Sequence, residues 1–217
     1  MTVIYLHGFA SSPESRKARF FAGRLREAGI ACWIADLEGG DFHGLTLSRQ
    51  LRVVDEMAAG ERVSLIGSSL GGYVAALFAA RHAETEKLVL LAPAFDFTNL
   101  WRERLGEQQL AEWREKGEME VFHYGAGRPE MIGYSLYADA LSYESFPAVA
   151  QPTLILHGVR GDVVPVAVAQ RFARNTSRAR LVTLDSDHEL TDQLDNLWLH
   201  AARFLGIEPL AIPGLAT

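Results

Sequence analysis

The sequence has a single cysteine, no apolar run of bilayer length and no excess of basic residues. Because Cys32 stands alone among 217 residues, an internal disulfide and a zinc site built from cysteines are both excluded. The apolar runs fall far short of the roughly 20 residues that a membrane-spanning helix needs, so we expect no membrane insertion. With 27 acidic and 21 basic residues, the net charge of −6 argues against nucleic acid as a partner.

The two ends of the chain carry little else of diagnostic value. The first residues, MTVIYLHGFASS, have the pattern of a strand and a turn, so we expect no export signal. Together with the single cysteine, this favours a cytoplasmic location. The last residues, IEPLAIPGLAT, form a tail that can dock or fray. The length of the chain suits one domain spanning residues 1–217.

Short apolar, β-branched runs alternate along the chain with longer segments of helical spacing. The predicted strands are Val3–Leu6, Ala31–Ala35, Val63–Ile66, Leu88–Leu91, Thr153–Leu156 and Leu181–Leu184. The predicted helices are Ser15–Ala28, Leu45–Ala59, Gly71–Arg81, Pro165–Arg174 and Asp192–Leu205. This alternation predicts an α/β fold with a mostly parallel sheet of about six strands and helices on both faces. Sites in such sheets form at the carboxyl ends of the strands.

One interval, residues 96–150, is far longer than a single crossover helix requires. Its first part, TNLWRERLGEQQLAEWREKG, has helical spacing of tryptophan and leucine, and a segment rich in tyrosine and glycine follows. Long insertions in compact domains usually serve a function. We therefore expect a helical cap over a pocket, although a surface excursion with its own small core would produce the same pattern.

The strongest chemical motif is Gly67-Ser68-Ser69-Leu70-Gly71, which follows a predicted strand and precedes a predicted helix. This is the Gly-x-Ser-x-Gly nucleophile elbow in the context it requires. The two glycines leave room for a sharp, strained turn that holds Ser69 out toward a pocket. A structural turn or a phosphate-binding loop is the alternative, but the sequence lacks the Lys-Ser/Thr pair and the Gly-x-Gly-x-x-Gly spacing of such loops.

An oxyanion that develops during acyl transfer needs two preorganised donors. Leu70 opens the helix after the serine, so its backbone N–H is one candidate. The first strand ends in His7-Gly8-Phe9, and hydrolases place their second donor in such a turn. We therefore assign the second donor to the backbone N–H of Phe9.

The catalytic base must follow the serine in the sequence, and His188 does so, on a loop after the last predicted strand. It would take the Ser69 proton on attack and return it to the leaving group. The other six histidines are interpreted as structural, surface or satisfied polar residues: His7, His43, His82, His123, His157 and His200.

A carboxylate is needed to orient the imidazole, and the turn after the fifth strand, HGVRGDVVP, offers Asp162. Together, YLHGFASSPES, GSSLGGY, LHGVRGDVVP and SDHEL resemble the α/β-hydrolase superfamily, especially its small YqiA-like esterases and related enzymes that act on acyl thioesters. The resemblance covers most of the chain. It implies a compact version of the fold that lacks the family's first two strands, with a triad of Ser69, Asp162 and His188.

The sequence departs from the family pattern at the acid. The usual aspartate lies two residues before Val-Val-Pro, where this chain has Gly161, with Asp162 next. Asp162 could reach His188 through a shifted turn. Asp96, after the fourth strand, could serve instead, or no acid is correctly placed.

These residues predict a serine hydrolase that cleaves ester or thioester bonds of small acyl substrates through an acyl-enzyme, with no cofactor or metal. An amidase, peptidase or carbon–carbon hydrolase could use the same triad, because fold and triad do not fix the bond that is cleaved. A non-catalytic binding protein of the same fold is the alternative from another class. The sequence does not indicate an oligomeric state.

Overall fold

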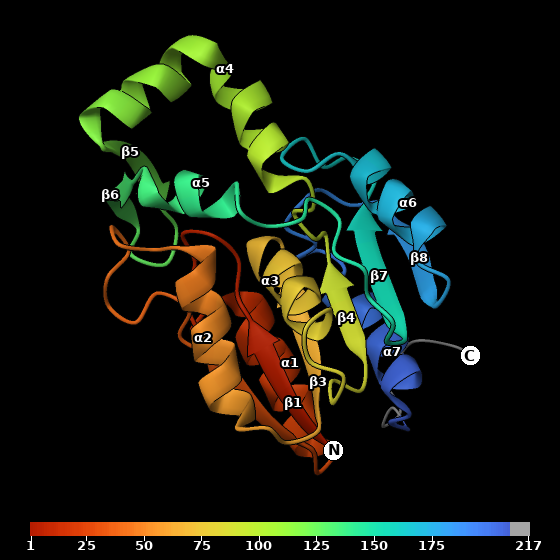
Figure 1. Cartoon of the computed structure of the whole chain (residues 1–217). Helices are drawn as coiled ribbons and strands as arrows, with labels where there is room; N and C mark the ends of the chain where they lie inside the picture. The colour runs from red at the N-terminus through yellow and green to blue at the C-terminus, as the bar shows by residue number, and fades with distance from the viewer. Residues whose placement is uncertain (209–217) are drawn as a thin grey trace.

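In the computed structural model, which describes residues 1–208, a single parallel sheet forms the centre of the molecule (Figure 1). Its strands lie in the order β2-β1-β3-β4-β7-β8. Their bounds are β1 (Thr2–Leu6), β2 (Ala31–Ala35), β3 (Val63–Ser68), β4 (Leu88–Leu91), β7 (Thr153–Gly158) and β8 (Ala179–Leu184). Each strand contains its predicted run, and all five pairings are parallel, so the predicted sheet is confirmed. Within the tail, residues 209–217 lie outside the described residues.

Helices cover both faces of this sheet, as the alternating pattern predicts. Helices α1 (Arg16–Glu27) and α7 (Leu194–Leu205) pack on one face. The other face carries α2 (Leu47–Ala58), α3 (Leu70–Ala79) and α6 (Val166–Asn175). The side-chain oxygens of Ser15 and Thr46 cap the first turns of α1 and α2, which explains why these helices begin where they do.

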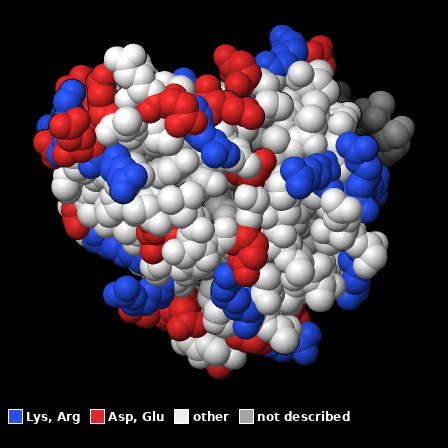
Figure 2. Space-filling view, turned by 45° about the horizontal axis from the view of Figure 1, so that its top comes forward, with Lys and Arg blue, Asp and Glu red and all other residues white. Residues whose placement is uncertain are grey.

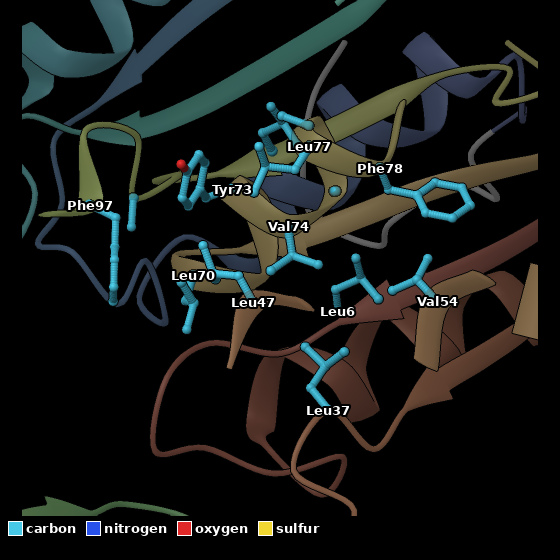
Figure 3. Packing of buried hydrophobic residues seen from close by; sticks show 14 of the residues in the cluster. Leu6, Leu37, Leu47, Val54, Leu70, Tyr73, Val74, Leu77, Phe78 and Phe97 are labelled. Carbon is cyan, nitrogen blue, oxygen red and sulfur yellow. The ribbon is translucent and has the colours of Figure 1, made fainter. Parts of the chain in front are cut away.

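Helix α3 lies at the centre of the larger hydrophobic cluster (Figure 3). Every residue of α3 is buried, so this helix is enclosed on all sides. Val74 and Leu77 of α3 pack in the same cluster as Leu6 of β1 and Val54 of α2. This packing fixes the first turn of α3, and with it the end of β3, inside the core.

The segment predicted as a cap contains α4 (Phe97–Lys116), β5 (Glu118–His123), β6 (Arg128–Gly133) and α5 (Ser135–Ala140). It lies beyond the carboxyl ends of the central strands (Figure 1). The hairpin of β5 and β6 was not predicted. Helix α4 breaks its helical geometry at Gly106, whose φ of 70° and ψ of 168° lie outside the helical region. The cap is therefore a bent helix, a hairpin and a short helix.

Polar contacts fasten this cap to the body. The imidazole of His123 on β5 lies 2.9 Å from a carboxylate oxygen of Glu38, and both side chains are largely buried. At the other end, the backbone N–H and hydroxyl of Ser48 on α2 donate to the carboxylate of Asp139 on α5. These contacts join the cap to the segment between β2 and α2 and to the first turn of α2, 85 and 91 positions away in the sequence.

The surface over the cap and the strand ends mixes charges of both signs. On the face shown in Figure 2, lysine and arginine side chains alternate with aspartate and glutamate, with uncharged surface between them. Within residues 1–208, none of the helices combines the length and apolar character needed to cross a membrane.

Candidate active site

The turn between β3 and α3 holds Ser69 in a strained backbone conformation, with φ of 51° and ψ of −116°. Such a conformation is costly for a residue other than glycine and persists only where the surroundings enforce it. A Cβ atom at Gly71 would lie 2.4 Å from the carbonyl oxygens of both Leu6 and His7. A Cβ atom at Gly67 would lie 2.4 Å from the carbonyl oxygen of Gly71. The two glycines of the motif therefore permit backbone approaches that no other residue allows.

The turn after β1 packs directly against Ser69. A Cβ atom at Gly8 would lie 3.4 Å from the Cβ atom of Ser69, so this turn and the elbow are in van der Waals contact. The next residue is Phe9, and Leu70 is the first residue of α3. Among residues 1–208, neither the Phe9 nor the Leu70 backbone N–H donates to a backbone acceptor outside regular elements. Two free donors beside the serine are what an oxyanion site requires.

His188 lies within hydrogen-bond distance of the serine. Its Nε2 atom is 3.0 Å from the Ser69 Oγ atom, although the two residues are 119 positions apart. The loop that carries His188 follows β8, and the Leu190 N–H donates to the Asp187 carboxylate there. A Cβ atom at Gly158 would lie 2.2 Å from the Asp187 carbonyl oxygen, so the turn after β7 supports this loop backbone to backbone.

The surroundings of His188 favour the neutral imidazole. Burial, and after it the nearby Lys17 ammonium group, lower the pKa of His188 from 6.5 to about 4, while the Glu189 carboxylate acts in the opposite direction. A neutral imidazole that accepts the Ser69 hydroxyl proton at Nε2 carries its own hydrogen on Nδ1. The His188 imidazole is therefore neutral at neutral pH, with Nε2 free to accept a proton.

The predicted acid does not join this pair. Within residues 1–208, the buried Nδ1 atom of His188 has no hydrogen-bond partner. Asp162 is exposed. The alternative, Asp96, accepts a hydrogen bond of 2.6 Å from the side chain of Asn99. The structure thus brings Ser69 and His188 together and leaves both candidate acids apart from the imidazole.

Two other histidines are buried structural residues, as predicted. His7 accepts from the Leu37 N–H through Nε2, and its Nδ1 lies 2.9 Å from the Gly8 carbonyl oxygen. His157 lies at the end of β7, where its Nε2 is 2.9 Å from the Val164 carbonyl oxygen. The remaining four make no hydrogen bond to Ser69: His43, His82, His123 and His200. Residues 1–208 contain no group of three or more side chains arranged to hold a metal ion.

Lys17 is the residue beside the site that the sequence analysis missed. Its ammonium group donates to the Glu189 carbonyl oxygen at 2.7 Å, and the side chain is 10% exposed. A signal existed in the sequence, because Lys17, Phe21 and Leu25 follow each other at intervals of four along α1 and share its buried face. A lysine on the apolar face of a helix is rarely buried without a partner.

Comparisons with known proteins agree with this fold and motif set. Residues 2–205 match the model of the Uncharacterised protein family (UPF0227). The AB hydrolase superfamily protein YisY of Bacillus subtilis (strain 168) is 27% identical over an alignment 228 positions long that covers 83% of this chain and 81% of the relative.

Solved structures show the same architecture. Mouse alpha/beta hydrolase domain-containing protein 10 superposes with a TM-score of 0.81 at 21% identity, covering 94% of this chain and 89% of that one. Est1E from Butyrivibrio proteoclasticus, solved with ferulic acid bound, superposes with a TM-score of 0.79 at 22% identity, covering 94% and 87%. At these identities the likeness shows the fold. The chain therefore belongs to the UPF0227 family and has the fold of the α/β-hydrolase superfamily.

Proposed function

We propose that the protein is a serine hydrolase that cleaves ester or thioester bonds of small acyl substrates, with Ser69 as nucleophile and His188 as base. The observation that carries this proposal is the 3.0 Å contact between the Ser69 Oγ and His188 Nε2 atoms at a strained elbow. A nucleophile and base within hydrogen-bond reach are the recognisable core of covalent acyl transfer.

The reaction would proceed in two steps. In the first, the Ser69 oxygen attacks the carbonyl carbon while its proton passes to the His188 Nε2 atom. The carbonyl oxygen becomes an oxyanion that the backbone N–H groups of Phe9 and Leu70 stabilise. The imidazolium then gives its proton to the leaving group, and an acyl-enzyme remains. In the second step, His188 takes a proton from water as the oxygen of that water attacks the acyl carbon. The bond from the acyl carbon to the Ser69 Oγ atom then breaks, the imidazolium returns its proton to that oxygen, and the acid is released.

The aromatic surroundings of the site favour an uncharged acyl group. The ring of Phe9 contacts the rings of Phe42 and Trp101, with centroids 5.4 Å apart in both pairs. Trp101 belongs to α4, so the cap contributes directly to the residues around the oxyanion donor. Burial of an apolar acyl chain against such rings would stabilise binding by about 25 cal/mol per Å² of apolar area.

The proposal also covers partners and location. A small acyl ester or thioester would be the only partner that the reaction requires, without nucleic acid, membrane or cofactor. A cytoplasmic location fits the single cysteine, which makes no disulfide in the described chain.

The test is turnover of p-nitrophenyl esters and acyl thioesters of increasing chain length by the wild type, Ser69→Ala and Ser68→Ala. We expect Ser69→Ala to lower kcat by a factor on the order of 10⁴ or more. Ser68→Ala is the matched control because it removes a hydroxyl from the adjacent residue, and we expect it to retain turnover. Equal turnover in Ser69→Ala and the wild type would contradict the proposal.

The same assay separates the alternative reactions. Cleavage of p-nitroanilides at a rate comparable to esters would indicate an amidase. Binding of acyl compounds without turnover of any ester, thioester or amide would indicate a binding protein.

A further inference from the structure

We propose that Ser69 and His188 work as a pair without a carboxylate on the imidazole, and that Lys17 positions the histidine loop in its place. This inference rests on the serine acyl transfer proposed above. In a complete triad the acid does two things: it orients the imidazole, and it stabilises the imidazolium that forms during attack. In this chain the two effects separate. Lys17 orients the imidazole by anchoring its loop, whereas no hydrogen-bonded carboxylate within residues 1–208 stabilises the imidazolium.

The first observation is the unpartnered Nδ1 atom of His188. This atom is buried, and within residues 1–208 no acceptor lies in hydrogen-bond range of it. In a complete triad this nitrogen donates to the acid, so the hydrogen bond that would define the third member is not formed by the described residues.

The second observation is the place of Gly161. A Cβ atom at this position would lie 3.3 Å from the His188 backbone nitrogen and 3.4 Å from its Cα atom. A side chain at Gly161 would therefore start directly against the histidine. The chain has no side chain there, and the carboxylate of the next residue, Asp162, belongs to an exposed residue. Glycine therefore stands beside the His188 backbone at the position where the usual sequence pattern has an aspartate.

The third observation is the anchoring by Lys17. Its Nζ atom donates at 2.7 Å to the carbonyl oxygen of Glu189, the residue that follows His188, and lies 3.4 Å from the Glu189 carboxylate. Lys17 is on α1, so the contact ties the histidine loop to the first helix across 172 positions. The Lys17 side chain is 10% exposed, whereas the Glu189 side chain is 66% exposed. Lysine is rarely buried without strong pairing, and here its main acceptor is the backbone of the catalytic loop.

The charge of Lys17 has the opposite sign to that of a triad acid. When Ser69 attacks, its proton moves to the His188 Nε2 atom and the imidazole becomes a cation with hydrogens on both nitrogens. Among the described residues, no carboxylate is hydrogen-bonded to the His188 Nδ1 atom. The Glu189 and Asp162 carboxylates favour the cation through space, whereas burial and the Lys17 ammonium oppose it. Burial and this ammonium hold the pKa of His188 at about 4. Lys17 thus fixes the geometry and keeps the base neutral, at the expense of imidazolium stability.

This arrangement narrows the class of substrate. Acyl donors whose leaving groups depart easily, such as thioesters and aryl esters, depend least on a stabilised imidazolium. Alkyl esters and amides, whose leaving groups must be protonated as they depart, depend on it most. We therefore infer that the substrate is an activated acyl donor.

The decisive experiment adds the acid. We expect Gly161→Asp to raise kcat for p-nitrophenyl acetate at least about tenfold, because a wrong or missing acid can lower the rate by about 10⁴-fold. We also expect the acidic limb of its pH profile to move to higher pH, since a carboxylate favours the charged imidazole. The backbone at Gly161 lies outside the left-handed region, so φ does not oppose the substitution, and the His188 backbone nitrogen, 3.3 Å from the new Cβ atom, must give way by a few tenths of an ångström. Gly161→Asn is the matched control, with the same shape and no charge, and should give neither effect.

Two further variants test the existing residues. Asp162→Asn should change kcat by less than about threefold, because the structure places this carboxylate outside the pair. Lys17→Met should lower kcat, leave KM unchanged and move the acidic limb upward, because it removes both the anchor and the opposing charge. Lys17→Arg, which keeps the charge and a donor, should recover part of kcat and keep the limb low. Circular dichroism melting would verify that each variant is folded.

The outcomes separate this inference from the proposed function. Loss of turnover in Ser69→Ala together with a loss of about 10³-fold or more in Asp162→Asn would overturn the inference and leave serine acyl transfer intact. The inference would also be overturned if Gly161→Asp and Gly161→Asn had the same kcat and the same pH profile. It would equally be overturned if folded Lys17→Met kept the acidic limb of the wild-type pH profile. Turnover that survives Ser69→Ala would instead overturn the function on which the inference rests.

Discussion

The turn after β3 and the turn after β7 both lie at the carboxyl ends of strands of the sheet, but the positions that matter for catalysis are enclosed to different degrees. The nucleophile elbow is enclosed by backbone, with 2.4 Å approaches to the Cβ positions of both Gly67 and Gly71. The turn after β7 is equally close to its neighbour at Gly158, where a Cβ atom would lie 2.2 Å from the Asp187 carbonyl oxygen, but at the position of a triad acid Gly161 is half-buried and Asp162 is exposed. The elbow is fixed by steric necessity, so its sequence motif is strict. At Gly161 the nearest atom lies 3.3 Å from the Cβ position, so this position is less tightly enclosed than the glycines of the elbow.

The largest effect should come from adding a side chain to a glycine of the nucleophile elbow. Gly71→Ala places a methyl group against the carbonyl oxygens of Leu6 and His7. Because backbone must move to admit it, we expect a loss of about 3 kcal/mol or more in the free energy of unfolding and loss of turnover. Urea unfolding followed by circular dichroism measures the first, and ester hydrolysis the second.

Gly23→Ala is the control for this substitution. Gly23 lies within α1, and a Cβ atom there would meet nothing within 4 Å. Alanine should stabilise the helix by up to about 1 kcal/mol. If both alanine variants unfolded at the same urea concentration, the steric account of the elbow would be wrong.

A smaller effect is expected in the pH dependence. Because the pKa of His188 is lowered to about 4, the imidazole is neutral over most of the acidic range. A base works when it is neutral, so kcat/KM should stay level from pH 7 to about pH 5 and fall tenfold per pH unit below about pH 4. A discontinuous assay with a thioester that does not hydrolyse by itself over this pH range measures the profile. If kcat/KM instead began to fall near pH 6.5, burial and Lys17 would not lower the pKa of His188 as the structure indicates.

The smallest effects should come from removing one carboxylate from each turn: Asp187 in the loop that carries His188, and Asp162 in the turn after β7. The Asp187 side chain accepts a hydrogen bond from the Leu190 N–H at 3.1 Å, inside the loop that carries His188. We expect Asp187→Ala to lower the free energy of unfolding by about 1 kcal/mol and to lower kcat several-fold. Asp162→Ala should stay within about 0.5 kcal/mol of the wild type, as surface substitutions do. Thermal melts resolve the difference, and equal melting temperatures would remove the distinction between the loops.

The sequence predicted those parts of the molecule in which local chemistry decides the structure. All six strands appear because β-branched runs bounded by turns have few alternatives. The elbow was predictable because only glycine fits beside Ser69, and His188 because a histidine after the last strand stands at the right edge of the sheet.

The parts that the sequence did not predict depend on distant contacts. The β5–β6 hairpin is held by pairs such as His123 with Glu38, which are 85 positions apart. The bend at Gly106 of α4 interrupts a segment whose spacing is helical throughout. The position of Asp162 depends on the path of one turn, and no pattern of residue types specifies whether a carboxylate there reaches an imidazole. Lys17 was overlooked for the same reason, because its acceptor lies 172 positions away.

The central claim is that the Ser69 oxygen becomes acylated, and trapping that intermediate tests it most directly. The protein would be mixed with p-nitrophenyl acetate, quenched in acid within milliseconds, digested and analysed by mass spectrometry. We expect an acetyl group on the peptide that contains Ser69, and no such mass in Ser69→Ala. An acetyl group on another residue, or turnover by the wild type without any acylated peptide, would contradict the account.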